Sequence, residues 1–584
     1  QKKNKNETQV VEHTLDGSVD QRGNPAIRTK SGRWGPGTLI LVNQGMATLA
    51  FYGVGVNLVL FLTRVVGQHN ADAANNVSKW FGTVYLFSLI GAFLSDSYWG
   101  RFRTCAIFQA IFVLGLALLS LSSYLFLLNP RGCGDKQTPC NSHSSLHVAI
   151  FYFALYMVAL GNGGYQPIIA TFGADQFDVE HPKERSSKIA YFSYFYLAFN
   201  LGPLISNTIL AYYEDYGKWE IGFSASAATA LMAMVLFLGG TPCYRHFKPQ
   251  GNPVLRFSRV FVAAIKKCKV VVPQDGDALY EIDAKDYSKN RCRRILHTQG
   301  FKFLDKAAVI TSKDCASQTK HLYDQRHLCT VTQVEEVKCI LRLLPIWLCT
   351  IMHSVVYTQM ASLFVVQGAE MRTNIGHLHI PPASMSSFDI LSVAVFIFLY
   401  RRVLNPLVLR LRKRGLIELE RMGFGLIFAI LAMIVSGIVE IFRLKYAIKD
   451  CKDCKYASSL SILWQIPQFV LIGASEVFMY VPQLEFFNGQ APEGLKSFGS
   501  ALYTTSMALG NYLSIVIVTI VMKITTRDNM HGWIPAKLNK GHLEKFYFLL
   551  AALTTVDFAV YLLCARSYKY VRENDSVHKE NIDF

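Results

Sequence analysis

Apolar stretches long enough to cross a membrane recur along the whole chain. Because an α-helix rises 1.5 Å per residue, about 20 apolar residues span the roughly 30 Å of hydrocarbon in a bilayer. In the first half such stretches lie near 38–63, 79–97, 104–128, 147–170, 189–213 and 221–241. In the second half they lie near 337–367, 384–403, 422–444, 459–482, 498–524 and 545–566. The pattern predicts an all-α membrane protein with twelve transmembrane helices in two six-helix bundles.

The composition argues against a soluble chain. Of 584 residues, 51% are hydrophobic and 17% are charged, whereas charged residues make up about 25% of an ordinary soluble protein. The formal net charge of +18 could indicate a nucleic-acid partner. However, Lys and Arg concentrate between the apolar stretches, where the positive-inside rule places them on the cytosolic side. We therefore expect the lipid bilayer as a partner, and no nucleic acid.

A long polar gap divides the chain into two halves. The expected parts are a cytosolic tail at 1–37, a bundle at 38–241, a linker at 242–336, a second bundle at 337–566 and a cytosolic tail at 567–584. An even number of helices returns both termini to the cytosol. Within the linker, apolar and basic residues interleave over 253–269, which predicts an amphipathic helix on the cytosolic face. No sorting signal is evident, so the plasma membrane is the default location.

The cysteines predict disulfides rather than a metal site. None of the 13 cysteines has the Cys/His spacing of a zinc site, so we expect no metal and no cofactor. Cys133 and Cys140 lie in the outside loop after the third helix, where an oxidising compartment favours a bridge between them. Cys451 and Cys454, in the outside loop after the ninth helix, form a weaker candidate pair. No Ser/His or His/Asp constellation occurs at one membrane depth, so we expect no enzymatic activity.

A charged turn follows the second apolar stretch. The sequence from 91 to 104 reads Gly-Ala-Phe-Leu-Ser-Asp-Ser-Tyr-Trp-Gly-Arg-Phe-Arg-Thr. Gly100 permits a tight turn, and Asp96 at a helix end can pair with Arg101 or Arg103, which would lock adjacent helices in one state. The alternative is a charged turn without a gating role. The stretch closely resembles the cytosolic gating loop of major facilitator transporters, which implies their fold.

Further motifs narrow the resemblance to one family. They are Ala-Phe-Tyr-Gly at 50–53, Gly-Ala-Asp-Gln-Phe at 173–177, Phe-Tyr-Leu-Ala-Phe-Asn-Leu-Gly at 195–202 and Gln-Leu-Glu-Phe at 483–486. With these the chain resembles the proton-coupled oligopeptide transporters, and in particular the plant nitrate/peptide transporter family. Its subfamily seven nitrate transporters share Asn-Gln-Gly at 43–45, Phe-Asp-Ile-Leu-Ser at 388–392 and Leu-Asn-Lys-Gly-His at 538–542. The resemblance covers nearly the whole chain.

The chain departs from this family at its charged proton-coupling motif. Most members carry Glu-x-x-Glu-Arg in the first helix and a Lys in the fourth, and the matching residues here are Gln44, Ala47, Thr48 and Gln166. Two acids and two bases are thus all neutral, a balanced loss that avoids an unpaired charge at membrane depth. We expect these residues still to line the cavity. The alternative is a decayed, inactive transporter.

Glu476, midway through the tenth helix, is the clearest acid within the membrane. Such a residue is a functional candidate by default, and we expect it to bind substrate and to couple protons, with Tyr480 and Gln483 on the same helix face. A structural ion pair is the alternative. Asp389 near the start of the eighth helix is a second proton-coupling candidate, although a solvated position near the membrane surface is an equal alternative.

The seventh helix bears on substrate. Nitrate-binding members of the family place a His at the position of Tyr357, two residues before Gln359, and His353 lies one turn earlier on the same face. A pocket of Tyr357, Gln166, Thr48 and a transiently protonated His353 can hold nitrate through hydrogen bonds, weakly and without a fixed cation. The alternative is a packed His353 that binds nothing.

Thr104 follows basic residues and matches the regulatory phosphothreonine of dual-affinity nitrate carriers in the family. A phosphate there would compete for the gating arginines, and a kinase would then be a partner. The alternative is a chance match.

The sequence thus predicts a major facilitator fold that moves nitrate by alternating access, with low affinity and with proton coupling altered by the lost charges. Nitrate, or potassium, and protons are the expected small partners. One alternative is a potassium/proton antiporter, because the cavity has lost its bases while keeping Glu476. Others are a carrier of a small organic substrate such as a hormone precursor or peptide, and a nitrate sensor whose transport is secondary.

Overall fold

The computed structural model describes most of the chain. The described residues are 13–14, 16–127, 144–178, 181–247, 253–271, 279–281, 295, 297–311, 328–375, 378–447, 458–491, 496–526, 532–535 and 537–568. The cysteines expected to form disulfides, Cys133 with Cys140 and Cys451 with Cys454, lie outside this part of the chain.

The first half folds into a bundle of long helices. Its helices are α1 (Trp34–Gly55), α2 (Leu58–Arg64), α3 (Asn70–Leu94), η1 (Ser95–Trp99), α4 (Arg101–Leu127), α5 (Ser145–Ala174), α6 (Pro182–Ile205), η2 (Ser206–Leu210), α7 (Ala211–Asp215) and α8 (Trp219–Gly239). α4 and α5 pack closely because α5 carries glycines on the contact face, and a Cβ at Gly161 would overlap the backbone of Phe112.

The second half forms the matching bundle. Its elements are α13 (Val331–Thr358), η6 (Gln359–Ala361), α14 (Leu363–Ala369), β1 (Asn374–Ile375), β2 (Leu378–His379), η7 (Pro382–Ser386), α15 (Ser387–Leu399), η8 (Tyr400–Leu404), α16 (Asn405–Arg412), α17 (Glu418–Lys445), η9 (Ile462–Gln465), α18 (Ile466–Gln490), α19 (Lys496–Thr525), η11 (Leu538–Lys540) and α20 (Leu543–Ser567). β1 and β2 pair antiparallel, with Asn374 opposite His379.

The membrane-spanning helices agree with the expected fold. Within the described part of the chain, eleven helical segments are long and apolar enough to cross a membrane, and the continuous helical run α6–η2–α7 covers the apolar stretch at 189–213 where the remaining span is expected. α3 begins at Asn70, nine residues before the apolar stretch that predicted it. The first residues of α3 can be polar because they face the other bundle, where Asn70 donates to the carbonyl of Pro535 at 2.9 Å and Asn75 to Thr519 at 3.4 Å.

The linker forms α9 (Pro253–Lys266) with the short α11 (Lys302–Asp305) and η5 (Lys306–Ala308), after η3 (Thr241–Cys243) ends the first bundle. Val260, Ala263 and Ala264 on the buried face of α9 pack with Leu304 and Val334. Part of the apolar face of α9 therefore packs against the rest of the linker and the start of α13.

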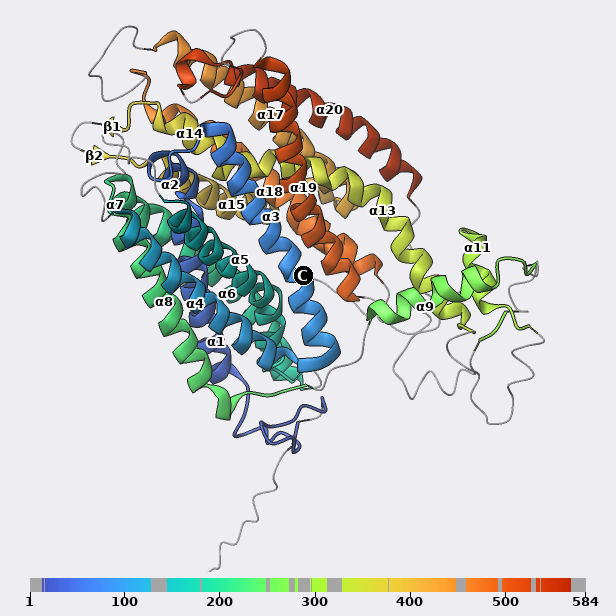
Figure 1. Ribbon diagram of the computed structural model, residues 1–584. Coiled ribbons are helices and arrows are strands. Elements are labelled where there is room, and N and C mark those ends of the chain that lie inside the picture. Colours follow the sequence, from blue (N-terminus) through green and yellow to red (C-terminus); the bar gives the residue numbers. More distant parts are fainter. Residues whose placement is uncertain are drawn as a thin grey trace, which may run out of the picture.

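The two bundles lie side by side and are not parallel (Figure 1). One end of the molecule carries α2, α7, α14 and the β1–β2 hairpin, and we call it the hairpin end; the other carries α9 and α11, and we call it the linker end. The bundles converge toward the hairpin end and diverge toward the linker end (Figure 1). α3 packs on α19, and α6 contacts α15.

Candidate functional site

The neutral residues of the first bundle are buried among its own helices. Gln44 is 0% exposed, and its side-chain oxygen lies 3.5 Å from the Tyr165 hydroxyl, which donates to Asn43. The Thr48 hydroxyl donates to the backbone carbonyl of Gln44 at 2.9 Å and packs against Gly202 of α6. Gln44 and Thr48, which we expected to line a cavity, are thus closed off by this packing. Ala47 is likewise 0% exposed.

Two amide groups in this bundle keep unused hydrogen-bonding capacity. The side-chain nitrogen of Gln44 and the side-chain oxygen of Gln166 are buried and have no partner among the described residues. Gln166 itself is half-buried on α5. A buried amide without a partner is costly, so each of these groups is a candidate partner for a water molecule.

His353 on α13 has one nitrogen bonded and one free. Its Nε2 lies 2.6 Å from the Oγ of Ser475, and that hydroxyl donates its own proton to the carbonyl of Gly425 at 2.8 Å. Ser475 must therefore accept from Nε2–H, which fixes the neutral tautomer and leaves a lone pair on Nδ1. Nδ1 is buried with no partner among the described residues. An added proton would reside there.

Aromatic rings surround this histidine. The Tyr480 ring stands edge-on to His353 with centroids 4.8 Å apart, to Tyr357 at 5.3 Å and to Tyr503 at 5.8 Å. The Tyr480 hydroxyl is buried beside the Ser354 side chain. His353 and Tyr357, both predicted site residues on α13, therefore meet through Tyr480, which supplies a further donor.

Glu476 and Asp389 are two neighbouring acids on α18 and α15 of the second bundle. Asp389 is 4% exposed and one of its carboxylate oxygens has no described partner, so the alternative of a solvated Asp389 is wrong. α15 and α18 approach closely because Gly473 packs against Asp389. Glu476 is half-buried one turn further along α18, within electrostatic range of the Asp389 carboxyl.

Tyrosines from both halves face this pair. The Glu476 charge acts on the hydroxyls of Tyr52, Tyr85 and Tyr196 in the first bundle and of Tyr357, Tyr480 and Tyr503 in the second. These tyrosines come from both bundles, so the region around Glu476 lies where the two bundles face each other. Gln483, expected on the same face, instead donates to Thr350 and Ser506 at 3.1 and 2.9 Å and holds helices together.

The charged turn pairs differently from our expectation. Arg101 forms its ion pair with Asp175 of the Gly-Ala-Asp-Gln-Phe motif rather than with Asp96, although Asp96 lies within electrostatic range of Arg101. Arg103 is exposed. Thr104 is 0% exposed, and its hydroxyl donates to the carbonyl of Gly100 at 2.8 Å. A kinase can reach Thr104 only after this end of α4 opens.

A hydrogen-bonded contact of the Asp215 carboxylate at the hairpin end joins the two halves, and sequence reasoning missed it. The Asp215 carboxylate binds Nη1 of Arg64 at 2.8 Å and Nε2 of His379 at 2.6 Å. Burial alone would raise the pKa of Asp215, but the hydrogen bond from His379 and the Arg64 guanidinium together lower it. Nearby, Asn207 of η2 donates to Ser386 of η7 at 2.8 Å. No motif signals this contact because its partners are far apart in sequence.

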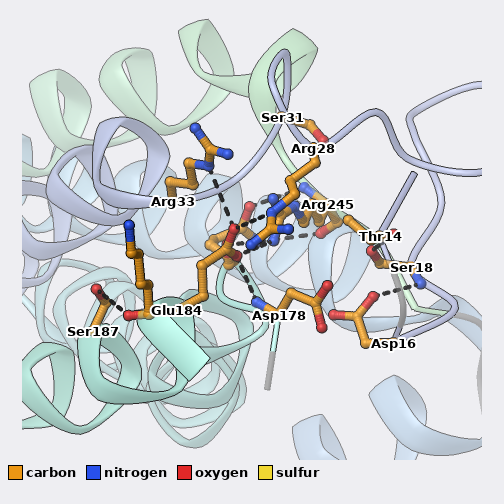
Figure 2. Close-up of polar contacts among 12 residues, drawn as sticks. Thr14, Asp16, Ser18, Arg28, Ser31, Arg33, Asp178, Glu184, Ser187 and Arg245 are labelled. Atoms are coloured by element: carbon orange, nitrogen blue, oxygen red, sulfur yellow. Dashed lines mark hydrogen bonds and ion pairs between the residues drawn. The ribbon is translucent and has the colours of Figure 1, made fainter. Parts of the chain in front are cut away.

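A second missed cluster lies on the first bundle at the linker end (Figure 2). Glu184 accepts from Arg28 at 3.0 Å, from Arg245 at 2.8 Å and from the backbone amide of Asp178 at 2.8 Å, and Arg33 lies 3.4 Å away. Burial opposes ionisation of Glu184, but the hydrogen bonds from Arg245 and Asp178 lower its pKa to about 2. The cluster fastens the segment before α1 to the bundle.

One group of side chains in the described chain has metal-ligand composition: His297, Asp305 and Glu335. Lys338 binds Asp305 and Glu335, each at 2.7 Å, and Thr298 donates to Glu335. These oxygens are occupied by cations and donors of the chain itself, so the cluster is an ion-pair network that ties the linker to α13.

Comparisons with known proteins agree with this architecture. The chain matches the family model PTR2, described as POT family, over residues 102–534. It is 64% identical over 567 residues to Protein NRT1/PTR FAMILY 7.3 of Arabidopsis thaliana, which covers 96% of this chain and 92% of the relative. It is 63% identical over 570 residues to Protein NRT1/PTR FAMILY 7.2 of the same plant, which covers 96% of each.

Solved structures resemble it in fold. An auto inhibited POT family peptide transporter superposes with a TM-score of 0.69 at 21% identity, over 93% of this chain and 99% of that chain. The POT family transporter PepTSo gives the same TM-score and identity, over 92% and 98%.

Proposed function

Since the chain belongs to the POT family and to its NRT1/PTR branch, we propose that this transporter carries nitrate across the membrane by alternating access, as a low-affinity secondary active transporter. In this proposal it is a multi-pass protein of the plasma membrane with both termini in the cytosol. The linker end then faces the cytosol and the hairpin end faces outside.

The unpartnered Nδ1 of His353 carries the proposal. In the neutral tautomer fixed by Ser475, Nδ1 presents a lone pair, which repels an anion. A proton on Nδ1 converts the lone pair into a donor and adds a positive charge, so nitrate and the proton favour each other's binding. Proton coupling therefore moves from the lost charged motif to this histidine.

The surrounding groups suit a weakly hydrated planar anion. The Tyr480 ring packs against His353 and against Tyr357, and in the proposal hydrogen bonds from the two tyrosine hydroxyls orient nitrate without a permanent cation. Since the only compensating charge is a proton that comes and goes, we expect low affinity.

The arrangement of the bundles fits one state of an alternating-access cycle. The Asp215–His379 contact closes the hairpin end, and the bundles diverge toward the linker end (Figure 1). In the proposal this is the state open to the cytosol. Opening to the outside requires that contact to break.

A second candidate function is potassium/proton antiport, and the acidic pair favours it. Glu476 and Asp389 share one buried region, where two like charges oppose joint ionisation. A monovalent cation would allow both to ionise, so the pair could release a proton as it takes up potassium. The two functions place the coupling proton on different groups.

Ion fluxes in an expressing cell separate these functions. Labelled nitrate and potassium uptake are measured while nitrate, potassium and pH are varied separately, in the parent and in His353→Ala, Tyr357→Phe and Glu476→Gln. If the chain transports nitrate, His353→Ala and Tyr357→Phe on α13 each weaken nitrate uptake by about fivefold to a hundredfold, since each removes a donor from a desolvated site. Potassium uptake is then unaffected. If Glu476→Gln loses potassium flux while nitrate uptake is unchanged in both α13 variants, the transported ion is potassium rather than nitrate.

A further inference from the structure

A pocket lies between the two bundles at the hairpin end, apart from the central site. It has a volume of about 600 Å³ and is lined by the start of α3, the end of α19 and the loop that follows α19. Cavities of this size hold small organic ligands and are far larger than nitrate requires. Asn70 and Pro535 form a hydrogen bond across the same junction. We call this cavity the junction pocket.

The lining favours an anion. Lys537 and Lys540 contribute two cations, and neither forms an ion pair with any described residue. α3 begins at this pocket, and the His69 side chain in the N-cap position does not accept a hydrogen bond from the helix. The positive end of the helix dipole attracts negative charge. Among the described lining residues Asp72 is the one acid, so the two lysines outweigh it.

The loop that presents the lysines is well packed. Leu538 is 1% exposed, Gly541 packs against Pro535, and the amide of His542 donates to the carbonyl of Trp533 at 3.0 Å. These residues belong to the stretch Leu-Asn-Lys-Gly-His at 538–542, for which the central transport site gives no role. The loop thus holds Lys537 and Lys540 over the pocket at little cost in conformational entropy.

The neighbouring surface is apolar. Met522, Ile534 and Pro535 line the pocket, and on α19 beside it Ile520 and Ile524 are 51% and 65% exposed. Exposed aliphatic side chains on a membrane-spanning helix face acyl chains. A ligand bound here therefore contacts the two lysines with one end and the lipid-facing surface of α19 with its other end.

From this we infer that the junction pocket binds the phosphate headgroup of a phospholipid, with its acyl chains along α19. Because the walls come from both bundles, the bound lipid holds the hairpin ends together and opposes their separation. The inference goes beyond the proposed function and is independent of nitrate, since it concerns a ligand that is not transported.

The test measures binding of dihexanoyl phosphatidylglycerol to the purified full-length protein in a neutral detergent. Each lysine near a lipid headgroup contributes about fivefold in affinity, so the double variant Lys537→Ala/Lys540→Ala should bind about 30-fold more weakly. Lys545→Ala, which removes an exposed lysine just beyond the loop, is the matched control and should bind like the parent. Thr519→Trp, which fills the pocket without removing charge, should also abolish binding.

The outcomes distinguish the sources of phosphate. Lipid binding that depends on both lysines and is not displaced by inorganic phosphate supports the inference. Displacement by millimolar inorganic phosphate with the same lysine dependence would assign the pocket to a free anion and overturn the lipid. Equal lipid affinity in the parent, the double lysine variant and Thr519→Trp would overturn the site itself.

Discussion

Replacing His379 by Ala should release the hairpin end while leaving each bundle intact. Of the two partners of Asp215, Arg64 belongs to the same bundle and His379 to the other. His379→Ala therefore removes the contact between bundles, while Arg64 still compensates the Asp215 charge. A hydrogen bond to a charged group contributes about 1.5–3 kcal/mol, so the ratio of outward-open to outward-closed molecules should rise about tenfold to 150-fold.

Distances between spin labels would measure the effect. Lys218 and Lys445 are exposed near the hairpin end, one on each bundle, and can carry the labels once the other reactive cysteines are replaced. His379→Ala should add a population at longer distance, whereas Arg64→Lys, which keeps the charge within one bundle, should not. A distance distribution unchanged by His379→Ala would refute the role of this contact in closing the hairpin end.

Three further predictions concern the other sites. Gln44→Glu should lower transport, because it places an acid in a fully buried position whose former basic partners are neutral; uptake above the parent level would contradict this. If the chain is a potassium/proton antiporter, Glu476→Gln should remove the pH dependence of net potassium transport while exchange survives, and an unaltered pH profile at normal expression would shift coupling elsewhere. Glu184→Gln should destabilise the protein by about 3–5 kcal/mol, since Arg245 is left buried, whereas Arg33→Ala, with a side chain 47% exposed, should cost under about 1 kcal/mol. Because the folded pKa of Glu184 is about 2 against a usual 4.5, the stability it provides is present above pH 4.5 and lost as pH falls toward 2, which thermal melting in detergent measures.

The fold could be predicted from the sequence because lipid imposes a long apolar stretch on each spanning helix. The predicted start of α3 was nine residues too late. The residues from Asn70 onward face the other bundle rather than lipid, so they need not be apolar.

The site was only partly predictable. Glu476 and His353 stand out in sequence because a titratable group within the membrane is rare. By contrast, the burial of Gln44 and Thr48 depends on a close approach of α6 at Gly202, which no local pattern encodes. Long-range contacts such as Asp215 with His379 likewise join residues whose sequences are individually ordinary.

Proton-dependent nitrate binding at His353 is the central claim, and labelled nitrate uptake at one low and one neutral pH tests it most directly. His353→Gln offers an amide N–H to Ser475 but cannot take up a proton. We predict that the parent takes up nitrate faster at low pH, and that His353→Gln, expressed at the same level, loses this stimulation and shows a KM for nitrate higher by about fivefold to a hundredfold. An unchanged KM with full acid stimulation in His353→Gln would contradict the account.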